Sequence, residues 1–97
     1  MAWYIIREAT HDDHAVLDAR AQAFIERHNL NFRPPDRESG ESWHGLVEGY
    51  LLDGDERDFD LHNTKRLRRL WRRIVARALG HEWAEGIAHG YVGYWRD

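Results

Sequence analysis

Residues 65–79 read KRLRRLWRRIVARAL, and this stretch decides how the chain folds. At about 100° of rotation per residue, an α-helix places these apolar side chains in one stripe and most of the basic side chains opposite. Gly80 comes directly after the last apolar residue, where glycine commonly ends a helix. The stripe consists of Leu67, Leu70, Trp71, Ile74, Val75, Ala78 and Leu79. The pattern therefore predicts a basic amphipathic helix over residues 65–79 with one face in the core.

The charge of this predicted helix differs sharply from that of the rest of the chain. The chain has a net charge of −3, yet residues 65–77 contain seven of its 14 basic residues and no acidic residue. The basic side chains expected on the exposed face are Lys65, Arg66, Arg69, Arg72, Arg73 and Arg77. Guanidinium groups pair well with phosphates and with carboxylates. Three explanations therefore stay open: an acidic protein partner, nucleic acid, or neutralisation within the fold by the acidic loop 53–60 or by the acids of the first helix.

The N-terminal part of the chain predicts a strand, a helix and a long loop. Residues 3–6 (WYII) are aromatic and β-branched, as is typical of a strand. Thr10 and Asp13 have the spacing of a capping box, which predicts a helix over residues 11–28. Residues 29–42 contain both prolines and predict an extended loop.

The remaining segments predict a further helix and a terminal strand. Apolar residues recur at helical spacing over residues 43–51, and Ser42 is in position for an N-cap. After Gly80 the pattern favours a short helix and then a strand over residues 91–95, which pairs with residues 3–6.

Two short segments share one glycine pattern. Gly45 and Gly49 precede a tyrosine with the same spacing as Gly86 and Gly90. Because paired glycines expose the backbone on one helix face, we expect two helices that cross closely at these positions.

Together these elements predict a small single α+β domain over residues 1–97. It has about three helices and a short two-stranded antiparallel ribbon formed by the terminal segments; an all-α bundle is the alternative. A chain of 97 residues that is 42% hydrophobic supports one core. The mean hydropathy of −0.78, the lack of cysteine and the absence of a signal-peptide pattern favour a cytoplasmic protein without a membrane span.

Several stretches come close to a catalytic or metal-binding motif, but none completes one. Residues 11–14 (HDDH) place two histidines one turn apart, and a metal site needs at least one more ligand. Residues 81–85 (HEWAE) have glutamate where the zinc-peptidase motif has its second histidine. Residues 53–64 lack the glycine and final glutamate of a calcium-binding loop, and Ser39 and Ser42 lie in no nucleophile elbow. We therefore expect no catalytic residue, metal or cofactor, and a minimal site of His81, Glu82, Glu85 and His89 is the weakest alternative.

The beginning of the chain carries one family resemblance. Residues 5–13 (IIREATHDD), followed by residues 15–17 (AVL), resemble the first strand and helix of GNAT-type N-acetyltransferases. The cofactor loop of that family ends in glycine or alanine and follows a strand, whereas residues 77–82 (RALGHE) end in glutamate and follow a predicted helix. Acetyltransferase activity is therefore not expected.

The side-chain inventory favours a binding protein over an enzyme. Five tryptophans, four tyrosines and a run of arginines are the residue types that dominate protein interfaces. Trp43 and Trp95 lie near predicted loop edges or the terminus, so they join the six basic residues as candidate partner-binding residues. We expect a small non-enzymatic protein that binds another protein, of the adaptor or inhibitor type carried by phages and other mobile elements. A homodimer is one form of such a partnership. The alternative is a nucleic-acid-binding regulator that uses residues 65–77.

Overall fold

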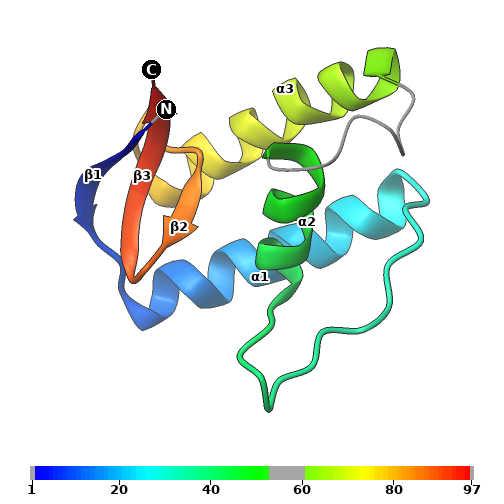
Figure 1. Cartoon of the computed structure of the whole chain (residues 1–97), viewed down its shortest axis with the longest axis horizontal. Coiled ribbons are helices and arrows are strands. Elements are labelled where there is room, and N and C mark those ends of the chain that lie inside the picture. Colours follow the sequence, from blue (N-terminus) through cyan, green and yellow to red (C-terminus); the bar gives the residue numbers. More distant parts are fainter. Residues whose placement is uncertain (1, 53–60, 97) are drawn as a thin grey trace.

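The computed structural model describes residues 2–52 and 61–96 and contains three helices. These are α1 (His11–Arg27), α2 (Trp43–Leu52) and α3 (Leu61–Leu79). Figure 1 shows α1 and α3 running in opposite directions, with α2 crossing in front of them and the strands gathered at one end. The helices predicted over residues 11–28, 43–51 and 65–79 are therefore present, and α3 begins at Leu61, before its predicted start at residue 65.

A three-stranded antiparallel sheet completes the α+β fold. Its strands are β1 (Ala2–Glu8), β2 (Gly86–Ala88) and β3 (Tyr91–Arg96), in the order β1-β3-β2. The predicted pairing of the terminal segments is confirmed, because Trp3 lies opposite Trp95 in the β1–β3 register. The two chain ends consequently lie side by side (Figure 1). The third strand, β2, was not predicted.

The prediction of a short helix after Gly80 is wrong. In its place β2 and β3 form a hairpin, whose turn residues His89 and Gly90 have positive φ angles of 55° and 84°. The expected crossing of two glycine-bearing helices is wrong for the same reason, since Gly86 lies in a strand. The segments do meet: a Cβ at Gly86 would lie only 2.6 Å from Oε1 of Glu48 in α2.

The start of α1 and the end of α3 are held by one arginine. The capping box is confirmed, because Thr10 Oγ1 accepts a hydrogen bond from the Asp13 N–H and Asp13 accepts one from the Thr10 N–H. Arg7 of β1 binds both carboxylate oxygens of Asp13 and donates a 2.8 Å hydrogen bond to the Leu79 carbonyl. The Arg7 guanidinium holds the pKa of the Asp13 carboxyl well below its usual range. A cation thus reaches the negative end of α3.

The core lies between α3, the other helices and the sheet. Trp71 is fully buried, and its ring centroid lies 5.3 Å from that of Phe24 in α1. The predicted stripe of α3 divides into two groups: four residues are buried and three are only half-buried. The buried members are Leu67, Trp71, Val75 and Leu79, and the half-buried members are Leu70, Ile74 and Ala78.

Residues 29–42 form the predicted loop, which contains neither helix nor strand. Asp18 of α1 fixes its end, because one carboxylate oxygen accepts the Trp43 N–H at 2.7 Å and the other binds Arg37. Gly45 N–H donates to the Ser42 hydroxyl, so Ser42 caps α2 as expected.

Candidate binding groove between α1 and α3

A groove of about 580 Å³ runs between α1 and α3. Its walls carry five arginines and one histidine, and its floor is formed by alanine, phenylalanine, leucine and isoleucine side chains. The residues from α1 are Arg20, Ala23, Phe24 and Arg27, with His28 at the end of the helix; those from α3 are Arg66, Leu70, Arg73, Ile74 and Arg77. We call these ten residues the basic groove. None of these ten residues is acidic.

The five arginines of the basic groove are exposed. Within residues 2–52 and 61–96, no carboxylate forms an ion pair with any of them. Two of the four acids of α1 bind elsewhere, since Asp13 binds Arg7 and Asp18 binds Arg37. The other two, Asp12 and Glu26, form no ion pair with the groove arginines. The expectation that residues 53–60 neutralise this charge lies outside the described residues. Several like charges around one concave surface favour an anionic ligand.

His28 lies at one end of the groove, close to the positive charges of Arg27 and Arg66. Its ring packs 4.5 Å from the Phe24 ring, measured between centroids. Burial lowers the pKa of His28 below its ordinary value, and the charges of Arg27 and Arg66 lower it further. An anion bound beside these guanidinium groups would offset their charge and raise the pKa of His28.

The opposite flank of α3 has a different environment. There Arg72 lies 2.7 Å from Oε2 of Glu85, which is only 4% exposed. The guanidinium is not oriented for a hydrogen bond to Oε2, so this contact is an ion pair without a directed hydrogen bond. Oε1 of the same carboxylate accepts the Trp95 N–H at 3.0 Å and an Arg96 N–H at 3.3 Å. Arg68 donates to the Leu51 carbonyl at 2.6 Å. This flank binds the protein's own groups.

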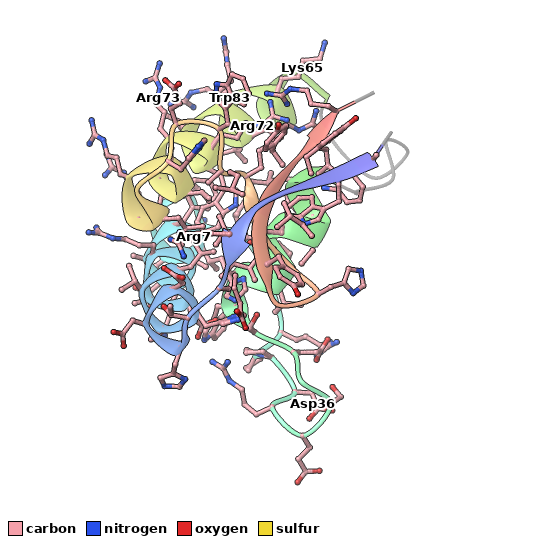
Figure 2. All side chains as sticks on the ribbon, turned by 90° about the vertical axis from the view of Figure 1, so that its left-hand side faces the viewer. Arg7, Asp36, Lys65, Arg72, Arg73 and Trp83 are labelled. Carbon is pink, nitrogen blue, oxygen red and sulfur yellow. The ribbon has the colours of Figure 1, made fainter. Side chains whose placement is uncertain are left out.

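The structure thus divides the six basic residues predicted as a partner-binding face. Arg66, Arg73 and Arg77 line the basic groove, and Arg72 pairs with Glu85. Lys65 and Arg69 are exposed but lie outside the groove lining. Figure 2 shows Lys65 and Arg73 reaching outward from α3, with Arg72 near Trp83.

The two tryptophans predicted to bind a partner lie outside the basic groove. Trp43 is half-buried against the core, and Trp95 packs edge-on against Trp3 with 5.1 Å between the ring centroids. The exposed tryptophan is instead Trp83, at 52%. A role for Trp43 and Trp95 in binding stays a prediction.

Sequence reasoning missed the α1 wall of the groove. Arg20 and Arg27 are exposed and seven residues apart, so they share one face of the predicted helix 11–28. That spacing was visible in the sequence, but only the packing of α1 on α3 shows that the face joins Arg66 and Arg73.

The histidine motifs do not assemble a metal site in the described parts of the chain. Among those residues no group of three or more histidine, aspartate or glutamate side chains is arranged to hold a metal ion. His14 instead contacts the buried His44, whose other ring nitrogen faces Glu48; both distances are 3.3 Å. Of residues 81–85, His81 Nδ1 accepts the Trp83 N–H, and Glu85 is held by the ion pairs described above.

Comparison with known proteins adds no relative. No family model, curated protein or solved structure matches this chain. The resemblance to N-acetyltransferases is limited to the first strand and helix, because Gly80 and His81 here follow α3, whereas the family places its cofactor loop between a strand and a helix. Among the described helices, none is long and apolar enough to cross a membrane.

Proposed function

We propose that this protein is a non-enzymatic binding module that holds an acidic segment of another protein in the basic groove. The observation that carries the proposal is the set of five exposed arginines, unpaired within the described residues, around one groove. Arginine is enriched at the energetic centres of protein interfaces, where its fork binds carboxylates in two places at once.

The composition of the groove floor favours a polypeptide over nucleic acid. Phe24, Leu70 and Ile74 line the floor, and Ala23 adds a further apolar group. A phosphate backbone uses the arginines but leaves this apolar surface against charged oxygens. A polypeptide supplies apolar side chains and carboxylates together.

The wider setting of this function is part of the proposal. A binding domain of this size fits an adaptor or an inhibitor, of the kind carried by phages and other mobile elements. The absence of cysteine supports a cytoplasmic location. The partner is either a different protein or a second copy of this chain.

Fluorescence anisotropy with three labelled probes tests the proposal: an acidic polypeptide such as polyglutamate, duplex DNA and single-stranded RNA, each at 50 and 200 mM salt. We expect the acidic polypeptide to bind. At the higher salt concentration, we expect both nucleic acids to bind at least about tenfold more weakly than the acidic polypeptide. Tight nucleic-acid binding, with an affinity that falls about a thousandfold between the two salt concentrations, would instead favour the alternative of a nucleic-acid-binding regulator.

Matched charge reversals locate the binding surface. Arg66→Glu with Arg73→Glu changes the groove, whereas Lys65→Glu with Arg69→Glu makes the same change in net charge on the same helix outside it. We expect at least about tenfold weaker binding for the first pair and little change for the second. Equal loss in both pairs would show a general charge effect and would contradict a specific groove.

A further inference from the structure

The arginines on the two walls of the basic groove repeat at the same interval. Arg20 and Arg27 on α1 are seven residues apart, and so are Arg66 and Arg73 on α3. Seven residues make about two helical turns, or about 10 Å along the helix axis. Both helices line the same groove and run antiparallel to each other (Figure 1), so the equal spacing gives cations at the same interval on each wall.

The floor between these walls is apolar surface that the two helices leave uncovered. Leu70 and Ile74 belong to the apolar stripe of α3, but they are only half-buried, whereas their neighbour Trp71 is fully buried. On α1, Ala23 is exposed beside them, and Phe24, which is only 2% exposed, closes the floor from the core side. The groove thus consists of an apolar strip with a row of cations on either side.

We propose that the occupant of the basic groove is an acidic amphipathic helix of a partner protein, packed along α1 and α3 as a third helix. This inference rests on the function proposed above and specifies the partner's chemistry. In a heptad numbered a to g, apolar residues at a and d contact the floor, and carboxylates at e and g face the arginines of the two walls. The seven-residue repeat of the arginines matches the repeat of those carboxylates.

An extended acidic segment fits the same surface less well. Side chains on one face of a strand recur about every 6.6 Å, which does not match the interval of about 10 Å between successive arginines. An extended backbone over the apolar floor also leaves its N–H and C=O groups without partners, whereas a helix satisfies them internally. Charge complementarity and backbone hydrogen bonding therefore favour the helix.

Synthetic peptides of three heptads test the inference against the full-length protein. The matched peptide has leucine at a and d, glutamate at e and g, and glutamine elsewhere; repulsion between its glutamates disfavours self-pairing. The face-swapped peptide has the same composition, with its glutamates moved to b and f. We expect the matched peptide to bind at least about tenfold more tightly and to gain helical circular dichroism on binding.

Variants on both walls complete the test. Arg20→Glu with Arg27→Glu and Arg66→Glu with Arg73→Glu change exposed side chains, so both proteins are expected to remain folded, which thermal unfolding checks. Each of these two double variants is expected to bind the matched peptide at least about tenfold more weakly than the unchanged protein. Lys65→Glu with Arg69→Glu is expected to keep the affinity within about twofold. Loss from one wall alone would overturn a helix that lies between both walls.

The outcomes separate this inference from the proposed function. Equal binding of the matched and face-swapped peptides, with sensitivity to the groove reversals, overturns the helical partner and leaves an acidic-segment binder. Binding of polyglutamate but of neither heptad peptide has the same meaning. If no acidic polypeptide binds, both proposals fail.

Discussion

The two flanks of α3 carry the same kind of side chain in opposite situations. Toward the sheet, Arg72 meets the buried carboxylate of Glu85, and that contact joins α3 to the β2–β3 region. Toward α1, Arg66 and Arg73 face further arginines and no carboxylate among the described residues. The first flank stabilises the fold, whereas the second keeps like charges together, an arrangement that an external anion relieves. An arginine run by itself therefore does not distinguish a structural residue from a binding residue.

The largest expected effect comes from removing the carboxylate on the sheet side. Glu85→Ala leaves Arg72 and Arg96 without their partner and the Trp95 N–H without its acceptor. We expect a loss of about 2–3 kcal/mol in the free energy of unfolding, measured by urea denaturation; this is below the cost of breaking a fully buried pair because both arginines are partly exposed. Glu85→Gln keeps an acceptor for Trp95 and is expected to lose less. Equal losses in the two variants would assign the effect to the charge of the carboxylate, with no contribution from side-chain packing or from the Trp95 hydrogen bond.

A smaller effect distinguishes two neighbouring arginines directly. Arg72→Ala removes the cation at Oε2 of Glu85 and is expected to cost about 1–1.5 kcal/mol, since Arg96 remains. Arg73→Ala removes an unpaired groove cation and is expected to change stability by less than about 0.5 kcal/mol. The same urea measurement on both variants checks the comparison. Similar losses for the two would mean that the flanks do not differ energetically.

The smallest effect is a shift in the titration of His28. Its pKa is lowered by burial and by Arg27 and Arg66, so the fold favours the neutral ring. The stability from this preference is present above the ordinary histidine pKa and is lost as pH falls below it. Arg66→Gln is expected to raise the pKa of His28 in an NMR titration, and Arg69→Gln to leave it unchanged. An unchanged pKa of His28 in Arg66→Gln would show that the charge of Arg66 does not act on this ring.

The same titration sharpens the contrast when a ligand is added. A bound polyanion offsets the charges of Arg27 and Arg66, so the pKa of His28 is expected to rise on binding. The bound state then holds more protons than the free state, and affinity increases as pH falls through the titration range of histidine. Calorimetric titration at several pH values measures this change. Affinity that does not vary with pH in this range would place the ligand away from His28.

Local patterns in the sequence were sufficient for much of the fold. The Thr10–Asp13 capping box and the stripe of α3 were predicted from spacing, and the pairing of residues 3–6 with residues 91–95 from their aromatic and β-branched side chains. The errors lie after Gly80, where Trp83, Ile87 and Tyr91 have helical spacing although residues 86–88 form a strand. There the secondary structure depends on tertiary contacts: β2 pairs with β3, and the Glu48 carboxylate of α2 approaches Gly86 closely because glycine has no Cβ.

The sequence by itself determined where the positive charge is concentrated and that one side of α3 is apolar, because helical periodicity is a local property of the chain. Only the tertiary structure decided what each arginine does. Glu85 follows α3 but is brought beneath Arg72 by the β2–β3 hairpin, whereas Arg20 precedes α3 by more than forty positions and yet shares a groove with Arg73. Ion pairs and grooves depend on distances between elements, and those distances are set by how the helices and the sheet pack on a shared core.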